Sequence, residues 1–356
     1  MRRMTPQSTL TDLLQIEHPL IQAPMAGVQG AALAIAVSNT GAQGNEPSAL
    51  LAPNAIAREL QALQTGTTRP VNLNFFCHTP PAPDAAREAA WRAALAPFYA
   101  EAGLDINAVP AGAGRVPFSH AIADLIEPFH PPILSFHFGL PAPDLLARVK
   151  AWGAVVMSSA TTVTEARWLQ AQGADAIIAQ GLEAGGHRGM FLSDDISTQM
   201  GTLALLAQVV GAVDVPVIAA GGIADAAGVA AAMALGAAGV QVGTAYLCSH
   251  EATTSALHRA ALQSEAAQHT ALTTLFSGRP ARGIVNRVIR ELGALNPAAP
   301  AFPLATAAIA PLRAHWEAQG RGDFSPLWAG QNASGCRSAS AAEITRRLVT
   351  GLARGR

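Results

Sequence analysis

The chain has 356 residues, enough for one large domain or two ordinary ones and for a sizeable buried core. Charged residues make up 13% and apolar residues 50% of the chain, a composition that excludes disorder. The formal net charge of -1 supplies no basic field for phosphate backbones, so we expect a small-molecule partner and no nucleic acid.

Three features of the sequence bear on where the protein is located and on the redox state of its cysteines. Residues 1–20 contain no continuous apolar run of the kind found in a signal peptide. Residues 226–250 are free of charge, but their alanines and glycines fit a buried strand with its flanking helix better than a membrane span. Cys77, Cys248 and Cys336 form no CxxC pair, so we expect free thiols and a cytoplasmic protein, and we make no prediction of oligomeric state.

Short apolar runs alternate with alanine-rich stretches of helical length, which is typical of parallel strands alternating with helices. This pattern predicts a (β/α)8 TIM barrel, with a doubly wound open sheet as the runner-up. The expected strands are His18–Met25, Thr40–Gly44, Arg69–Phe76, Pro132–Gly139, Ala154–Ala160, Ala174–Gln180, Val215–Ala220 and Gly239–Ala245.

Helix boundaries follow two of these strands. Thr162 and Glu165 have the spacing of a capping box, and Gly173 is placed to end the helix that starts there. A second helix is expected over Asp225–Leu235, closed by Gly236.

Two segments are additional to the strands and helices that a minimal TIM barrel requires. Residues 77–131 contain a helix-like run at 85–101 and are expected to form a helical insertion. The predicted division is a barrel over 1–245, a mainly helical lid over 246–321 and a C-terminal segment, 322–356, that returns to the barrel.

Glycines follow strands seven and eight, where TIM barrels usually hold a phosphate. Gly222 and Gly243 would let backbone N–H groups approach an anion, although glycines at strand ends also simply turn the chain. There is no GxGxxG and no P-loop, so a mononucleotide or a sugar phosphate fits better than a dinucleotide.

The densest group of polar residues is Gln180–Gly189, directly after strand six. His187 is the prime acid–base candidate, because imidazole changes its charge near neutral pH; the alternative is a structural histidine. Glu183 is expected either to orient a neighbour or to pair with Arg188.

Strands one and three also end in candidate residues. The segment Gln22–Gly27 either presents its backbone to a planar ring or is an ordinary part of the buried core. Asn72 and Asn74 share one face of their strand. Cys77 and His78 would point to opposite faces, which counts against a Cys–His nucleophile pair.

Other types of catalysis would need residue patterns that the sequence does not contain. The sequence holds no HExxH and no GxSxG, which removes zinc peptidase and common hydrolase chemistry. Lys150, the only lysine, precedes strand five at the end of the barrel away from catalysis, so Schiff-base chemistry is close to excluded.

The motifs together resemble those of the FMN-dependent nitronate monooxygenase family, formerly called 2-nitropropane dioxygenases. Gln180–Gly189 is the most specific match, and flavin-dependent enoyl reductases of the same superfamily share much of it. The matching segments are 22–27, 74–76, 136–141, 158–162, 180–189, 219–223, 241–244, 278–283 and 327–331.

The resemblance implies an FMN over the barrel mouth, with His187 matching the family's active-site histidine. It implies a carbonyl compound and nitrite as products from alkyl nitronates, or nitroalkanes, and O2, without nicotinamide. The implied FMN-binding residues are Ala23, Pro24, Met25, Asn74 (favoured over Asn72), Gln180, Gly185, Gly222, Gln241, Val242, Gly243 and Thr244.

Two other functions stay open at this stage. One is an NAD(P)H-dependent enoyl-thioester or quinone reductase on the same fold, and the other is a non-catalytic FMN- or phosphate-binding barrel. The second is motivated by Gln43, Asn45 and Glu46, where the family's strand two is more apolar. The arginines of the lid are expected to hold an anionic substrate or to form surface ion pairs; they are Arg279, Arg282 and Arg287.

Overall fold

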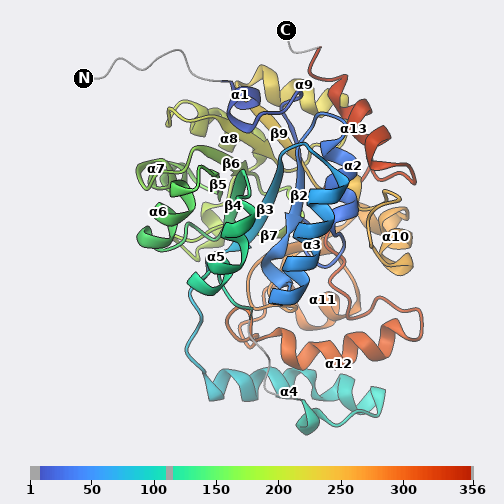
Figure 1. The fold of residues 1–356 in the computed structure, drawn as a ribbon. Coiled ribbons are helices and arrows are strands. Elements are labelled where there is room, and N and C mark those ends of the chain that lie inside the picture. The colour runs from blue at the N-terminus through green and yellow to red at the C-terminus, as the bar shows by residue number, and fades with distance from the viewer. Residues whose placement is uncertain (1–8, 110–114, 354–356) are drawn as a thin grey trace.

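The computed structural model describes residues 9–109 and 115–353, and its centre is a closed barrel of eight parallel strands (Figure 1). The strand order is β1-β9-β8-β6-β5-β4-β3-β2. Ile21 and Gln43 form a bridge that joins the first strand to the last, and the Gln43 N–H donates to the Leu20 carbonyl over 2.9 Å. The predicted TIM barrel is confirmed, and the open sheet is wrong. The strands are β1 (Leu20–Gln22), β2 (Gly44–Pro47), β3 (Val71–Phe76), β4 (Ile133–His137), β5 (Val155–Ala160), β6 (Ala176–Gln180), β8 (Val217–Ala220) and β9 (Gly239–Val242).

Helices surround the barrel, and α1 (Leu10–Leu14) closes the end at which the strands begin. Leu10 and Leu14 are buried against inward-facing strand residues such as Ile21 and Met157. The outer helices are α2 (Ala31–Ser38), α3 (Pro53–Gly66), α5 (His120–Ile126), α6 (Pro143–Ala151), α7 (Val163–Ala171), α8 (Thr202–Val210), α9 (Ala226–Ala234) and α13 (Ala341–Val349).

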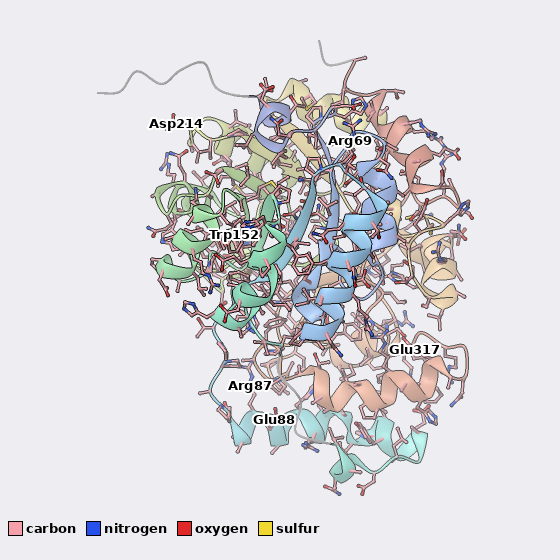
Figure 2. All side chains as sticks on the ribbon, in the orientation of Figure 1. Arg69, Arg87, Glu88, Trp152, Asp214 and Glu317 are labelled. Carbon is pink, nitrogen blue, oxygen red and sulfur yellow. The ribbon has the colours of Figure 1, made fainter. Side chains whose placement is uncertain are left out.

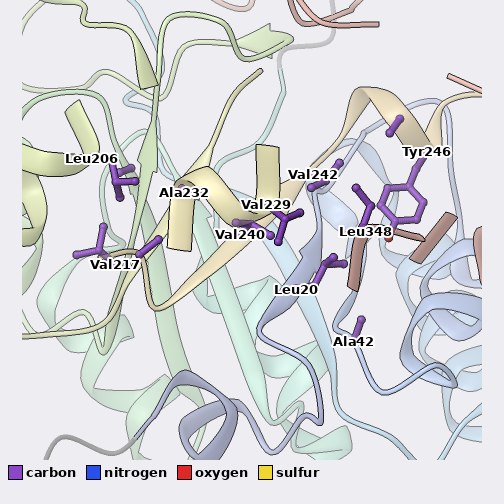
Figure 3. Close-up of a cluster of buried hydrophobic side chains, with 14 of the residues drawn as sticks. Leu20, Ala42, Leu206, Val217, Val229, Ala232, Val240, Val242, Tyr246 and Leu348 are labelled. Atoms are coloured by element: carbon purple, nitrogen blue, oxygen red, sulfur yellow. The ribbon is translucent and has the colours of Figure 1, made fainter. Parts of the chain in front are cut away.

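The core between strands and helices follows from the alternation of side chains along each strand (Figure 3). Val240 and Val242 of β9 point outward and pack in one cluster with Val229 of α9 and Leu348 of α13. Full burial of such a side chain contributes about 1.5–3 kcal/mol, so this outer layer supplies much of the stability of the barrel.

The predicted helix boundaries are largely confirmed. Thr162 caps α7 by accepting from the Glu165 N–H over 3.1 Å, and Asp225 caps α9 by accepting from the Gly228 N–H over 2.9 Å. The capping box is only half formed, because the Glu165 carboxylate bonds Thr161 and the Phe191 N–H instead.

The prediction for strand two is wrong in its position. The strand begins at Gly44, where the prediction ends, and continues to Pro47. Its polar residues concealed it, because Asn45 and Glu46 are fully buried in spite of their side chains. Gly44 is required here, since a Cβ would lie 2.0 Å from the Ala34 carbonyl oxygen of α2.

A second layer covers the carboxyl ends of the strands, opposite to α1 (Figures 1 and 2). In it, α4 (Ala85–Ala102), the helix predicted at 85–101, packs on α12 (Thr306–Glu317). The Trp91 Nε1–H donates to the Ala305 carbonyl over 3.1 Å, and the Tyr99 hydroxyl donates to the Ala308 carbonyl over 2.6 Å. Segments more than 200 residues apart therefore form one apolar cluster.

The segment after the barrel contains α10 (Ala256–Leu262) and α11 (Arg287–Leu292), but also two strands that were not predicted. These strands, β10 (Thr270–Thr273) and β11 (Ala281–Ile284), form an antiparallel sheet with β7 (Gly186–His187). The division of the chain at residues 245 and 321 stays a prediction. Over residues 9–109 and 115–353, no helix is both long and apolar enough to cross a membrane.

Candidate functional site

A pocket opens at the carboxyl ends of the barrel strands, with about 1320 Å³ of space that includes its open mouth. Its floor is made by inward-facing side chains at the ends of β3, β4, β5, β6 and β9, which alternation places at a common level. These residues are Asn74, His137, Ser159, Gln180 and Gln241.

The structure brings nearly all predicted site residues to this pocket. Those that line it are Ala23, Pro24, Met25, Asn74, Gln180, Gly185, His187, Gly222, Gln241, Gly243 and Thr244. Val242 does not line it, because alternation along β9 turns its side chain outward into the core. The implied part of Val242 in FMN binding, as one residue of the segment 241–244, stays a prediction; its carbonyl accepts from the Ala23 N–H over 2.8 Å.

One end of the pocket is made of backbone. Gly222 has a φ of +70°, and in the described chain the N–H groups of Gly222 and Ile223 donate to no protein acceptor. A short 3-10 helix begins at Thr244, directly after β9. Glycines together with a short helix after the last two strands are the usual phosphate site of a TIM barrel.

The loop at 330–332 closes over this end. The Gly330 N–H donates to Thr244 Oγ1 over 2.9 Å, and the Asn332 amide donates to the Gly222 carbonyl over 3.0 Å. Gly185 permits this approach, because a Cβ there would lie 2.5 Å from the Gly330 nitrogen.

The segment after β1, residues 23–26, forms an apolar wall of the pocket. Side chains behind this wall hydrogen-bond its backbone. The Met25 N–H donates to Gln29 Oε1 over 3.0 Å, and the Gln29 amide donates to the Asn45 carbonyl over 2.5 Å. The backbone of Asn45 therefore supports this wall through Gln29.

Polar side chains of the floor are partly satisfied by one another. Asn72 and Asn74 both donate to Ser135 Oγ, over 2.6 and 2.9 Å, which confirms that they share a face. In the described chain, no donor bonds Asn74 Oδ1. Gln180 is held between two backbone groups, since its amide donates to the His187 carbonyl and its Oε1 accepts from the Gly189 N–H.

His187 lies on β7, so the small sheet made with β11 fixes its backbone. Its Nε2 is 2.8 Å from Ser277 Oγ. Burial lowers the pKa of His187 well below 6.5, and the positive charges of Arg115 and Arg279 add to this effect. The imidazole is therefore neutral at neutral pH.

His137, which the sequence reasoning did not select, lies beneath His187. Its Nε2 is 3.1 Å from the His187 carbonyl, which only accepts, so Nε2 carries the proton and Nδ1 accepts from the Ser159 hydroxyl. Burial lowers its pKa to about 4. Its place as the last residue of β4 was the signal that could have identified it.

Arg115 was also missed, because it lies in the 77–131 insertion and follows no strand. It lines the pocket, and its guanidinium carbon is 5.1 Å from the centroid of the Phe302 ring. Burial lowers its pKa to about 10, so it stays a cation at neutral pH.

The three lid arginines have different partners. The guanidinium carbon of Arg279 is 4.2 Å from the centroid of the Phe138 ring, and that ring packs against Phe302. Arg282 donates to the Leu182 carbonyl over 2.9 Å. Arg287 pairs with Glu101 of α4 over 2.7 Å, so its role is an ion pair between the lid and the insertion.

Glu183 and Arg188 each have another partner. Glu183 accepts from the Thr202 N–H over 2.7 Å at the start of α8, which confirms that it orients a neighbour. Arg188 is fully buried and donates to the carbonyls of Gln180 and Gly181, both over 2.6 Å. The predicted pair between Glu183 and Arg188 is wrong, because the strand-end carbonyls need the guanidinium donors.

Other chemistry finds no support at the site. Lys150, on α6, pairs with Asp175 over 2.8 Å and does not line the pocket, as predicted. The described residues contain no group of three or more His, Cys, Asp or Glu placed to hold a metal ion.

Comparison with known proteins agrees with this geometry. A family model described as nitronate monooxygenase matches residues 7–351. The chain is 42% identical to a nitronate monooxygenase of Pseudomonas aeruginosa over 95% of this chain and 97% of that one. It is 40% identical to a nitronate monooxygenase of Paraburkholderia phytofirmans over 98% of this chain and 96% of that one.

Solved structures give the same result. A nitroalkane oxidase from Streptomyces ansochromogenes superposes with a TM-score of 0.89 at 38% identity, covering 98% of this chain and 99% of that one. A FabK mutant from Thermotoga maritima superposes with a TM-score of 0.73 at 25% identity, covering 98% and 97%.

Proposed function

The chain belongs to the nitronate monooxygenase family, and on that premise we propose that it oxidises alkyl nitronates with O2 to a carbonyl compound and nitrite, using FMN. The family resemblance of the sequence is thereby confirmed, and the protein is an oxidoreductase of the TIM-barrel class.

The residues of the pocket fit a flavin mononucleotide. The unpaired N–H groups of Gly222 and Ile223, with the short helix at Thr244, suit its phosphate. The apolar wall and Asn74 Oδ1, which accepts no hydrogen bond in the described chain, suit a flat ring with polar edges. When bound, FMN supplies the electron transfer, and the protein supplies binding, orientation and electrostatics.

His187 is the proposed catalytic base for neutral nitroalkanes. The Ser277 hydroxyl lies 3.4 Å from the Arg279 carbonyl, which only accepts, so Ser277 directs its proton there and receives one from His187 Nε2. His187 Nδ1 is then left without a proton and free to take one from carbon.

Arg115 is the proposed partner of an anionic nitronate. It remains protonated within a largely buried pocket, where a charge interaction is stronger than in water. Because the lowered pKa leaves His187 neutral, Arg115 is better suited than His187 to hold the nitro oxygens.

Aromatic rings pack beside the proposed base. The ring centroid of His187 is 5.4 Å from that of Phe302 and 5.5 Å from that of Trp328. These apolar neighbours favour the neutral form of the imidazole over the charged form.

The single observation that carries the proposal is that His187 lines the same barrel pocket as Gly222 and Ile223, whose N–H groups donate to no acceptor in the described chain. The test is the visible spectrum of the purified protein without O2, before and after addition of an alkyl nitronate, with NADH in parallel. A flavin band that nitronate bleaches and NADH does not supports the proposal, and nitrite should then form on admission of air.

A second function is kept because the chain also resembles FabK over 98% of its length. It is the NAD(P)H-dependent reduction of an enoyl thioester or quinone. Bleaching by NADH, with no response to nitronate, would favour it, whereas a flavin that neither donor bleaches would favour a binding protein. We also propose the cytoplasm as the compartment, supported by free thiols at Cys77, Cys248 and Cys336.

A further inference from the structure

His78 is a buried imidazole behind the wall of the pocket, and the proposed function gives it no role. It lies two residues after β3, is 4% exposed and does not line the pocket. Burial lowers its pKa from 6.5, so the ring is neutral at neutral pH and carries one proton. Its Nε2 is 3.0 Å from the carbonyl oxygen of Arg115, which only accepts, so the proton is on Nε2. Its Nδ1 has no partner among the described residues, so the one hydrogen bond of this side chain there is to Arg115.

The segment that carries Arg115 is attached to the barrel at two points. The Phe118 N–H donates to the Phe76 carbonyl at the end of β3 over 2.8 Å, and the His78 ring holds the Arg115 carbonyl. Over residues 9–109 and 115–353, no other hydrogen bond reaches the backbone of residues 115–117. The contact with His78 therefore fixes the point at which the Arg115 side chain leaves the backbone.

The same imidazole packs on the ring beside which the Arg115 guanidinium lies. The ring centroids of His78 and Phe302 are 4.8 Å apart and their planes meet at 88°, which is an edge-to-face contact. The guanidinium carbon of Arg115 is 5.1 Å from the Phe302 centroid, within the range of a cation–π interaction. In the described chain this guanidinium has no ion pair and donates no hydrogen bond, so its N–H groups are available to a ligand in the pocket. His78 therefore contacts both the backbone of Arg115 and the ring that supports its charge.

We propose that His78 is a positioning residue for Arg115, and that through Arg115 it sets the preference of the pocket for an anionic nitronate over a neutral nitroalkane. The hydrogen bond fixes the backbone of Arg115, and the packing of His78 on Phe302 fixes the ring beside the guanidinium. A guanidinium that is already held in place loses less side-chain freedom when it binds an anion. Charge-assisted hydrogen bonds form with the nitronate but not with the uncharged nitroalkane. This inference rests on the proposed function, in which Arg115 receives the nitro oxygens.

The test compares two replacements of His78 in the full-length, FMN-loaded protein. Propyl-2-nitronate and 2-nitropropane are the substrates, and nitrite is the product that is measured. H78F keeps a ring against Phe302 but removes the donor, whereas H78Q keeps an N–H donor. H78F should raise the KM for the nitronate about 2–10-fold, which corresponds to one hydrogen bond, with smaller changes in kcat and in the KM for 2-nitropropane. H78Q should restore most of the nitronate KM.

A double variant tests whether the effect passes through Arg115. R115Q should raise the KM for the nitronate, and H78F should then add nothing in the R115Q background. Multiplication of the two effects would overturn the proposal. A KM that H78F leaves unchanged, or raises equally for both substrates, would overturn it as well.

Hydrogen exchange of the purified protein tests the positioning without any substrate. The Phe118 amide should exchange several-fold faster in H78F than in wild type, and at the wild-type rate in H78Q, because H78F removes one of the two attachments of the segment. Equal exchange in all three proteins would overturn the positioning. If H78F does not fold, the imidazole nitrogen spectrum of wild type takes its place: a His78 ring protonated at Nε2 supports the contact, and one protonated at Nδ1 alone overturns it.

The two sets of measurements separate this inference from the proposed function. Faster exchange in H78F, together with an R115Q protein of unchanged nitronate KM, would uphold the contact between His78 and Arg115 and refute the role of Arg115 as the partner of the anion. A flavin that nitronate does not bleach would contradict the proposed function itself, and the exchange of the Phe118 amide would still decide whether His78 holds Arg115.

Discussion

Replacement of Glu46 by Gln should make the protein more stable at high pH. Glu46 is 1% exposed on β2, and in the described chain its Oε2 has no hydrogen-bond partner. Its pKa is raised from 4.5 to about 8, by burial first and then by the charge of Glu59 on α3. The folded state therefore binds this proton more tightly than the unfolded state does.

The sign and size of the effect follow from linkage. A pKa raised by folding contributes stability that is fully present below pH 4.5 and is lost as the pH rises to about 8. One pKa unit corresponds to about 1.4 kcal/mol, so wild type should lose about 3–4 kcal/mol between pH 5 and pH 9 from this group alone. Glu46→Gln keeps the size of the side chain and does not titrate, so it should escape this loss.

The assay is urea unfolding of both proteins at pH 5, 7 and 9. All other titrating groups are shared, so the change with pH in the difference between the two free energies of unfolding isolates Glu46. Glu343→Gln, at an exposed carboxylate of α13, is the matched control and should alter that difference by less than about 0.5 kcal/mol. Parallel pH profiles for wild type and Glu46→Gln would refute the reasoning.

Four further predictions test the site and the fold. His187→Asn should retain FMN but lose about 10²–10⁴-fold in nitroalkane turnover, measured as nitrite release, and a near wild-type rate would disprove its role as base. Gly222→Ala should cost about 1 kcal/mol because its φ is +70°, and should weaken FMN binding in a fluorescence titration. Gly320→Ala, at φ +73°, is its control and should carry the same backbone strain, without the 3.3 Å approach of a Gly222 Cβ to Glu183 Cβ, while leaving FMN binding unchanged. Tyr99→Phe should lose about 1 kcal/mol in urea unfolding, since it removes the hydrogen bond that the hydroxyl donates to the Ala308 carbonyl of α12; an unchanged midpoint would argue against the α4–α12 contact. Burial lowers the pKa of His258 to about 4, so stability should fall as the pH drops from about 6.5 to about 4, by up to about 3 kcal/mol from this group, and His258→Gln should reduce that fall.

Much of the barrel and its site could be predicted because both depend on local pattern. A buried parallel strand requires a run of apolar residues, and this requirement is visible in the sequence at β3 to β6. The loops that follow the strands must meet at one end of a barrel, so Gln180–Gly189 and the glycines after β8 were expected to share a pocket before their distances were known. The candidate base, the ring wall and the phosphate end all follow from this rule.

Other features depended on contacts between distant segments. β2 was misplaced because its polar residues Asn45 and Glu46 do not form the apolar run by which a buried strand is recognised, and they are buried only because β3 and α2 cover them in the fold. β10 and β11 escaped notice because each is short and is completed only by pairing with β7.

The sequence alone determined the barrel, the family resemblance and the residues at the strand ends, because alternation, glycine placement and strand order are properties of neighbouring residues. Only the tertiary structure decided which groups are dry, charged or in contact. It placed Arg115 beside Phe302 and set His137 beneath His187. Burial and electric charge depend on everything that surrounds a group, and those surroundings come from segments that meet only when the chain has folded.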